Sequence, residues 1–290
     1  MGITLADIRE AGLRRKKPLS PALRNTNIVI GGVIVLVMVF IALFPGLVAS
    51  HDPLAYSADL MLRPPSAEHI FGTDHLGRDI FSRVIWGARI DLMMGVVAVI
   101  TPFILGTLIG LLAGYYGGFM DSLMMRACDI FMAFPFTLIV IVVVTVTGPS
   151  ITNLFIAMWL VSWMHYARLV RGEVLVAKNA EYIQAARVLG YTNIRLLLRH
   201  LLPNVISGCV VYAASDIVMC MLAGASMSFL GLGIQPPTPE WGAIIEGGRA
   251  YISNAWWIAA FPGLFLAVTG TGFSLIGDGL SDLLRTRGRA

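Results

Sequence analysis

The sequence is poor in charged residues and in cysteine. Only 13% of its 290 residues are Asp, Glu, Lys or Arg and 57% are hydrophobic, whereas about 25% of a typical soluble chain is charged. This imbalance argues against a soluble protein. The formal net charge of +4 does not indicate a nucleic-acid partner, because the basic residues lie beside apolar runs. The three cysteines lie within or next to such runs, so we expect packing residues and no disulfide framework.

Lysine is also scarce, and this excludes one class of ATP-binding protein. None of the three lysines, Lys16, Lys17 and Lys178, belongs to a Gly-x-x-x-x-Gly-Lys-Ser/Thr loop. If ATP is used, another chain must therefore bind it, and we expect no cofactor in this one. No His-Glu-x-x-His pair occurs, and His165 has no second His or Cys at helical spacing. We therefore expect neither an enzyme nor a metal site.

Six long apolar runs predict an all-α polytopic membrane protein. A bilayer core of about 30 Å requires about 20 helical residues, and the runs are continuous rather than alternating, which favours helices over barrel strands. The first run exceeds the about 7–15 residues of a secretory signal, so we expect a retained helix. The predicted spans are Asn27–Ala49, Asp91–Tyr116, Ala127–Val146, Ile151–Val170, Val205–Leu230 and Trp257–Ile276.

The positive charges predict the orientation. Sixteen of the 21 Lys and Arg residues fall on the side that holds both termini, so both termini are expected in the cytoplasm. The predicted organisation is a tail (1–26), a first helix with an external loop (27–90), a core of five helices with a cytoplasmic loop at 171–203 (91–277), and a second tail (278–290). A further external segment spans Gly231–Ala255 and contains Gln235–Gly242.

The cytoplasmic loop predicts two short helices joined by a bend. Asn179 is a suitable N-cap, Glu181 favours the first turn, and Gly190 is typical of a helix end. Pro203 marks the start of the fifth span. The second helix is expected to carry one apolar stripe, formed by Ile194, Leu197, Leu198 and Leu201. A compact knob of this kind fits a groove on another protein.

The knob resembles the EAA loop of ABC importer permeases. The resemblance lies in Glu-Tyr-Ile-Gln-Ala-Ala-Arg-Val-Leu-Gly at 181–190, followed by His-Leu-Leu-Pro at 200–203. Gln184 stands where the motif has Glu, and His200 replaces an apolar residue. The resemblance assigns contact with an ATPase to Glu181, Tyr182, Gln184, Ala185, Ala186, Gly190, Leu202 and Pro203.

Three further stretches resemble the dipeptide, oligopeptide and nickel permeases of the DppC/OppC type. The first is an external signature at 71–83 that contains Gly72, Thr73, Asp74, Gly77, Arg78 and Asp79. The second is Ser228–Gly233. The third is the closing stretch Gly277–Leu280 with Asp282, although Ser281 stands where arginine is common. The resemblance covers about residues 27 to 283.

This resemblance implies a type I, MetI-like permease fold of six transmembrane helices in a bacterial inner membrane. The chain would be a transport subunit rather than an enzyme, and would form half of an alternating-access pathway. Its implied partners are a homologous permease in a heterodimer, two ATPase subunits that bind ATP and Mg, and an external or periplasmic substrate-binding protein. Dipeptides or oligopeptides are the expected substrates, with nickel or a metal chelate as the alternative.

A different class, a secondary transporter that works without ATP, stays open. It predicts inverted repeats or broken helices with several intramembrane charges, and neither is clear in the sequence.

Several single residues have two interpretations. Gly106, Gly110, Gly114 and Gly118 recur every four residues, which suits tight packing within the chain or contact with the partner permease. Asp216, midway along the fifth span, could line the pathway or pair with a neighbouring polar group. Met219 could meet a soft cation in that pathway or serve as apolar filling.

Overall fold

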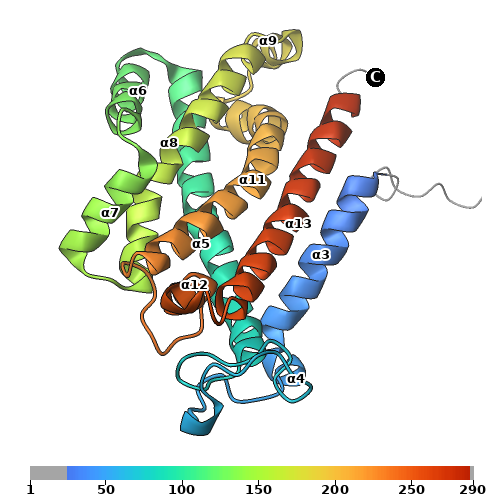
Figure 1. Cartoon of the computed structure of the whole chain (residues 1–290). Helices are drawn as coiled ribbons and strands as arrows, with labels where there is room; N and C mark the ends of the chain where they lie inside the picture. Colours follow the sequence, from blue (N-terminus) through green and yellow to red (C-terminus); the bar gives the residue numbers. More distant parts are fainter. Residues whose placement is uncertain (1–24, 288–290) are drawn as a thin grey trace, which may run out of the picture.

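The computed structural model describes residues 25–287 and contains no β-strand within that range (Figure 1). The predicted tail at 1–26 lies outside the described residues except for its last two positions. Of the predicted tail at 278–290, the part up to Arg287 continues the last helix instead of leaving it. The last three residues lie outside the described range.

Five long helices form the bundle. These are α3 (Thr26–Leu43), α5 (Ile80–Tyr116), α8 (Ile151–Ala177), α11 (Leu202–Phe229) and α13 (Trp257–Arg287). Shorter helices connect them: α4 (Pro45–Val48), α6 (Gly118–Met132), α7 (Phe136–Thr147), α9 (Glu181–Val188), α10 (Asn193–Arg195) and α12 (Trp241–Gly248). Three single turns complete the order: η1 (Ala58–Leu60), the π-helical η2 (Leu196–Leu201) and η3 (Arg249–Tyr251).

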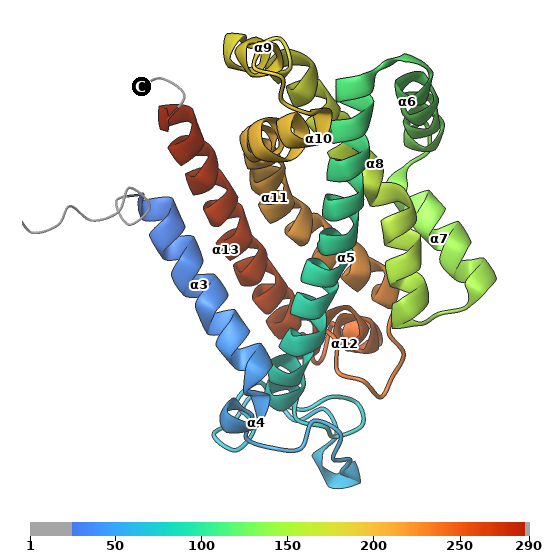
Figure 2. The same ribbon diagram turned by 180° about the vertical axis from the view of Figure 1, so that it is seen from behind.

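The centre of the bundle is the contact between α5 and α8 (Figure 2). Gly106, Gly110 and Gly114 face α8 so closely that a Cβ on any of them would come within 3.0 Å of α8 atoms. The absence of a side chain therefore lets the two backbones approach. Gly118 does not continue this row, because it has a φ of +68° and begins α6. Three of the four glycines thus pack within the chain.

The helix bounds differ from the predicted spans at two proline positions. The first span is interrupted at Phe44, before Pro45, and continues as the short α4. The third span was predicted as one helix over Ala127–Val146, and this was wrong: α6 and α7 meet at an angle of 84°. Pro135 lacks an amide hydrogen and disfavours helical geometry at the preceding residue, so the chain turns there.

The second span starts earlier than predicted. Asp79 accepts a hydrogen bond from the Ser82 amide at 2.7 Å, and this N-cap begins α5 eleven residues before the expected start at Asp91. The described residues contain four helices long and apolar enough to cross a membrane alone, and α6–α7 would count as a fifth span if the bent pair crosses. The remaining predicted span lies in the 27-residue α8, whose length of about 40 Å exceeds a bilayer core. The count is thus consistent with six.

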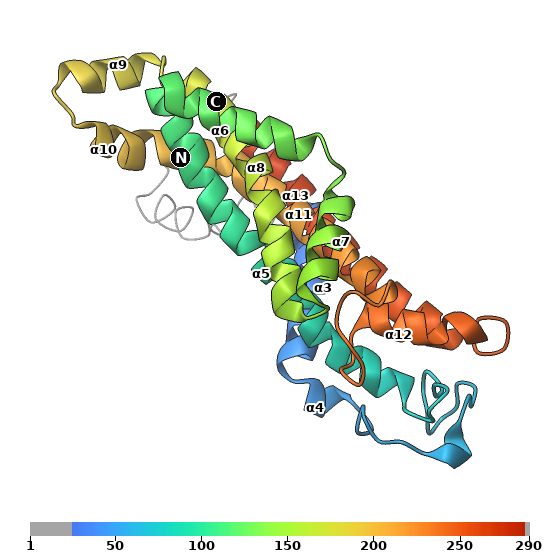
Figure 3. The same cartoon turned by 90° about the vertical axis from the view of Figure 1, so that its left-hand side faces the viewer.

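The molecule has two distinct ends (Figure 3). The start of α3, the end of α13 and the α9–α10 segment lie at one end. The loop between α4 and α5 and the helix α12 lie at the other. The first end therefore groups the segments that the sequence assigns to the cytoplasm.

Candidate functional site

Residues 181–201, called here the hook, project from the first end of the bundle between α8 and α11 (Figure 3). α9 ends in a Schellman motif: the Gly190 amide donates to Arg187 O at 2.9 Å and the Tyr191 amide to Ala186 O at 3.2 Å. Gly190 has a φ of +77°, which confirms the predicted bend. The predicted N-cap at Asn179 was wrong, because Ala180 occupies that position and the Asn179 amide group donates backwards to Leu175 O.

The hook is tied to two neighbouring helices as well as to α8. The hydroxyl of Tyr115, at the end of α5, donates to Asn193 Oδ1 at 2.7 Å, and the guanidinium of Arg187 lies 5.5 Å from the centre of the Tyr115 ring. Asn204, in the first turn of α11, donates to the Tyr182 hydroxyl oxygen at 2.7 Å. These contacts join α9 and α10 to α5 and α11, so a displacement of the hook would be passed to three long helices.

The inner face of the hook is apolar and buried, through Ile183, Ala186, Leu196, Leu197 and Leu201. The predicted single stripe was wrong, because Leu197 and Leu201 are buried whereas Ile194 and Leu198 are exposed. The cause is the π-helical turn η2, whose wider repeat changes which side chains share a face.

The outer face of the hook is also apolar, and it is open. Val188 is 89% exposed, Leu189 72% and Ile194 67%. These three side chains are together called here the outer patch of the hook. Val188 and Leu189 lie at the end of α9, outside the candidate membrane-spanning helices, and Ile194 lies in the first turn of the helix that follows. Exposed apolar side chains at such a place are suited to contact with another protein.

The other predicted residues of the loop lie on or next to the hook. Glu181, Gln184 and Ala185 are exposed on α9, and the Gln184 amide group reaches Lys178 O at 3.5 Å. Leu202 is partly buried and Pro203 is exposed; both lie where the π-helical turn passes into α11, and a proline within a helix is accommodated by such a local change of repeat. Lys178 adds a further tie, since its ammonium donates to Gly114 O at 2.8 Å.

Asp216 has a partner inside the bundle. The Tyr166 hydroxyl, on α8, donates to Asp216 Oδ2 at 2.8 Å, so the pair links α8 with α11. This contact favours the structural interpretation of Asp216, whose side chain is nevertheless only partly buried. Met219, one turn further along α11, is 66% exposed.

The external signature forms a loop held by its own polar groups. Asp74 Oδ1 accepts from the amides of Leu76 and Arg78, and Asp74 Oδ2 accepts from Arg78 Nε at 2.7 Å. Gly72 and Gly77 both have a φ of +74°, which favours glycine. The Thr73 amide donates to Arg63 O at 3.0 Å. The residues of the external signature therefore hold the loop in a defined conformation next to the start of α5.

Asp79 completes this arrangement. Its Oδ1 lies 2.9 Å from His69 Nδ1 while its Oδ2 caps α5. Donor atoms of His51, His69 and Asp79 all lie within 4.8 Å of one another, close enough for a shared metal ion. Asp79 thus joins the loop to the helix: Oδ1 contacts His69 in the loop and Oδ2 caps α5.

Sequence reasoning missed a buried carboxyl pair at this end. Glu240 Oε1 and Oε2 accept from the amides of Gly242 and Ala243 at 2.8 Å each, which caps α12. Asp91 Oδ2, on α5, accepts from the Trp241 amide at 3.1 Å. Both carboxyl groups are fully buried and adjacent, and two such groups in contact cannot both be ionised.

This pair fastens α12 onto α5. Burial raises the pKa of the Glu240 carboxyl above its ordinary value. The Trp241 indole adds a hydrogen bond to Val84 O at 2.9 Å. An available signal was the acidic residue that precedes Trp241-Gly242, since a carboxylate before an apolar helical segment is a typical N-cap. Its partner, about 150 positions away, carried no such local signal.

Comparison with known proteins decides the family. Residues 106–289 match the model of the family described as binding-protein-dependent transport system inner membrane component. The chain belongs to this family. The match includes the hook, α11 and α13.

Three named relatives align with most of the chain. It is 41% identical over 261 residues to the dipeptide transport system permease protein DppC of Alkalihalophilus pseudofirmus, covering 90% of this chain and 86% of that protein. It is 40% identical to the probable D,D-dipeptide transport system permease protein DdpC of Escherichia coli, with 88% and 86% covered. It is 42% identical to the glutathione transport system permease protein GsiD of Pectobacterium atrosepticum, with 90% and 87% covered.

A solved structure of this family fold agrees. A chain of the MetNI methionine ABC transporter, in an inward-facing conformation, superposes with a TM-score of 0.55 at 19% identity over 67% of this chain and 93% of that chain. At this identity the likeness concerns the fold alone. Together with the family match it confirms the predicted MetI-like fold.

Proposed function

We propose that this chain is a permease subunit of an ATP-driven, binding-protein-dependent importer of dipeptides or other short peptides. It would lie in a bacterial inner membrane with both termini in the cytoplasm and form half of the pathway. A homologous permease would supply the other half, and two ATPase subunits would bind ATP and Mg. The names of the dipeptide and glutathione permeases that it resembles support the choice of substrate.

The observation that carries this proposal is the hook. Its outer patch is exposed, and its base is bonded to α5 and α11 and continuous with α8. An ATPase subunit that moves when ATP binds would pull on the outer patch. Because the hook is held by hydrogen bonds and a buried inner face, the pull would rotate three helices together rather than bend the hook.

The alternating-access cycle follows from two packings of these helices. Closure of the ATPase pair would draw the hooks together, close the cytoplasmic side and open the external side to a loaded binding protein. Hydrolysis would restore the first packing. Each ligand shifts the balance only through its different affinity for the two packings.

Two alternatives have specific grounds. The bent α6–α7 pair is a broken helix of the kind that secondary transporters use, which the sequence did not reveal. In the described residues, the ion pairs of α6 join it to α8: Arg168 pairs with Asp129 and Arg171 with Asp121. These charges therefore hold two helices together, which favours the importer over the secondary transporter. A nickel or metal-chelate importer of the same family is the second alternative, and its cargo would have to be recognised outside the hook.

A pair of substitutions at Gly190 tests the proposal. A Cβ there would meet no atom within 4 Å, so a new side chain acts only through the positive φ. Gly190→Val should strain the bend by about 1–2 kcal/mol, whereas Gly190→Asn should be tolerated, since asparagine adopts this conformation more readily. We expect the transporter with Gly190→Val to assemble and hydrolyse ATP but to import less peptide per ATP in proteoliposomes.

Gly190→Asn serves as the matched control and should keep the ratio of peptide to ATP. Equal ratios in both variants would contradict a force-transmitting bend. Peptide flux through this chain without ATPase subunits would favour the secondary transporter instead.

A further inference from the structure

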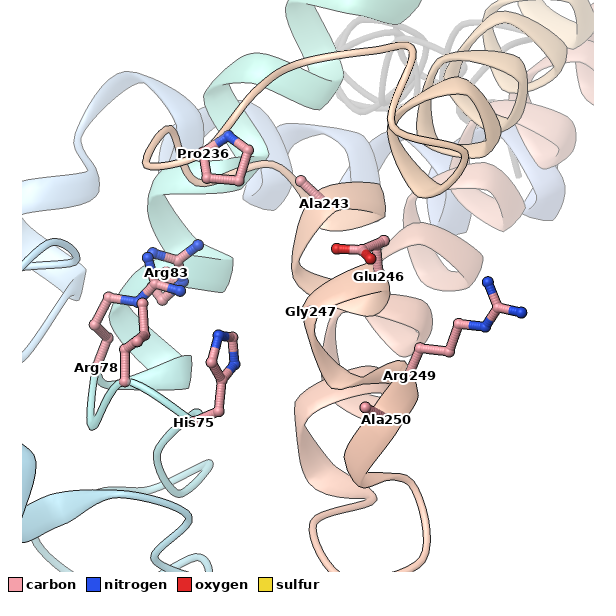
Figure 4. A pocket seen from close by; sticks show the side chains of 10 residues that line it. His75, Arg78, Arg83, Pro236, Ala243, Glu246, Gly247, Arg249 and Ala250 are labelled. Carbon is pink, nitrogen blue, oxygen red and sulfur yellow. The ribbon is translucent and has the colours of Figure 1, made fainter.

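A cavity of about 520 Å³ opens between the external signature loop and α12 (Figure 4). Arg78, Arg83 and His75 line one wall, and Glu246 and Arg249 stand on the opposite wall, on α12 and η3. Sites for small ligands usually measure about 300–1,000 Å³, so the cavity is large enough for one. The proposed contact between the hook and an ATPase subunit does not involve this cavity.

The wall formed by the signature loop holds more positive than negative charge. Arg78 and Arg83 are 9% and 3% exposed, and both lie next to the carboxylate of Asp74. Arg78 Nε is 2.7 Å from Asp74 Oδ2, but Arg83 Nε is 3.8 Å from the same atom, beyond hydrogen-bond length. One carboxylate thus faces two buried guanidinium groups.

Two buried donor or acceptor atoms of this wall lack partners. Arg83 Nε and His75 Nδ1 form no hydrogen bond to any part of the chain that the structure describes. Buried polar atoms are normally paired, so each unpaired atom calls for a missing partner. Both belong to residues that line the same cavity.

The rest of the cavity is built to hold these groups in place. The His75 ring stacks on Tyr251 at 5.4 Å between centroids with an interplanar angle of 11°. Arg83 also donates from its NH1 group to Pro53 O at 3.3 Å. The His75 ring and the Arg83 guanidinium therefore have fixed positions on the wall formed by the signature loop.

We propose that this cavity binds a carboxylate, with Arg83 as its main cationic partner. Arg249, whose guanidinium lies 5.6 Å from the centre of the Phe229 ring, would be a weaker contact that has to turn toward the opening. A guanidinium and a carboxylate form paired, charge-assisted hydrogen bonds, which satisfies an unpaired Nε. Glu246 provides a place for an ammonium group, so an amino acid or peptide terminus fits the charges of both walls. An acidic side chain of a docked binding protein presents the same carboxylate.

The test has two arms, both on the assembled transporter in lipid nanodiscs without ATP. In the first, calorimetry measures the binding of dialanine and of dialanine amide. In the second, interferometry measures the association of the transporter's own binding protein at low and high salt. Each arm compares the natural chain with Arg83→Gln, Arg83→Lys and Arg249→Gln. Arg63→Gln removes an external charge that does not line the cavity and is the matched control.

If the carboxylate comes from a free peptide, the natural chain binds dialanine better than its amide. Arg83→Gln weakens dialanine binding by about tenfold or more, as the loss of a charged hydrogen bond does. Arg249→Gln, at an exposed residue, weakens it less, and Arg83→Lys retains part of the affinity. In the Arg83→Gln variant the acid and the amide bind equally, a result that a general loss of folding would not give.

If the carboxylate comes from the binding protein, the same substitutions weaken its association and flatten its salt dependence, while dialanine does not bind. The proposal is overturned if neither ligand binds the natural chain, or if Arg83→Gln and Arg249→Gln behave like Arg63→Gln in both arms. The inference relies on the proposed importer role only for the source of the carboxylate. Because ATP is absent, a failed binding test leaves the hook proposal standing, and a failed coupling test with the Gly190 variants leaves the binding result interpretable.

Discussion

The two ends of the molecule are stabilised in opposite ways. At the hook end, large apolar side chains stand in the open: Leu189 is 72% exposed at the tip of a folded segment. At the external end, charged side chains are buried: Asp74 bonds to its own loop and Asp79 caps α5. At the external end most charged groups find partners within this chain, whereas the hook exposes apolar side chains that suit the contact with another protein proposed above.

The largest effect is expected from breaking the external end. Asp74→Asn removes the carboxylate that faces Arg78 and Arg83, and an unpaired buried charge costs about 3–5 kcal/mol. Thermal unfolding of the purified complex should show a clearly lowered midpoint, while the hook should still bind ATPase subunits after assembly at low temperature. An unchanged midpoint would mean that the signature loop does not depend on this ion pair.

The second largest effect is expected from a substitution at the hook end. Leu189→Asp places a charge in the outer patch, where truncation of a central contact typically costs about 2 kcal/mol or more of binding energy. Affinity for the ATPase subunits, measured by pull-down across a concentration series, should fall by more than tenfold without loss of folding. Leu54→Asp, at an apolar residue 48% exposed at the external end, is the matched control and should leave this affinity intact.

A smaller effect is expected where the hook joins α5. Tyr115→Phe keeps the ring beneath Arg187 but removes the hydroxyl that donates to Asn193, a loss of about 1 kcal/mol. Hydrogen exchange should become faster in α10 and stay unchanged in α12. The ratio of imported peptide to hydrolysed ATP should fall, and ATPase affinity should not. A loss of affinity equal to that of Leu189→Asp would show that Tyr115 supports folding rather than coupling.

The smallest effect concerns pH and the external end. Because the pKa of Glu240 is raised in the folded chain, the folded state holds its proton more tightly than the unfolded state. The stability that this proton confers is complete below the ordinary pKa of glutamate and is lost as pH rises through the raised value. The unfolding midpoint should therefore decline from acidic to neutral pH, and Glu240→Gln should flatten the decline. An equal slope in both proteins would place the proton elsewhere.

Features governed by composition and by local backbone chemistry were predictable from the sequence. Apolar length located the spans, and Gly190 located the bend because a positive φ selects glycine. The break at Pro135 could have been inferred, but a continuous apolar composition on both sides concealed it. The faces of Leu197 and Leu198 were not predictable, since a π-helical turn changes the repeat.

The contacts between segments far apart in the chain could not be predicted from the sequence. Asp91 and Glu240 meet only because α12 folds back onto α5, and neither residue signals the other in the sequence. The same holds for Tyr166 with Asp216 and for the two walls of the external cavity. The family resemblance gave the fold and the expected partners, whereas the positions of these side chains required the structure.

Cross-linking from the tip of the hook tests the central claim most directly. A cysteine at Leu189, with the buried natural cysteines retained, would be treated with a short thiol cross-linker in inverted membrane vesicles, with and without ATP. We predict a product with an ATPase subunit whose yield changes when ATP binds. A product formed only from the opposite side of the membrane, or none under either condition, would contradict the account.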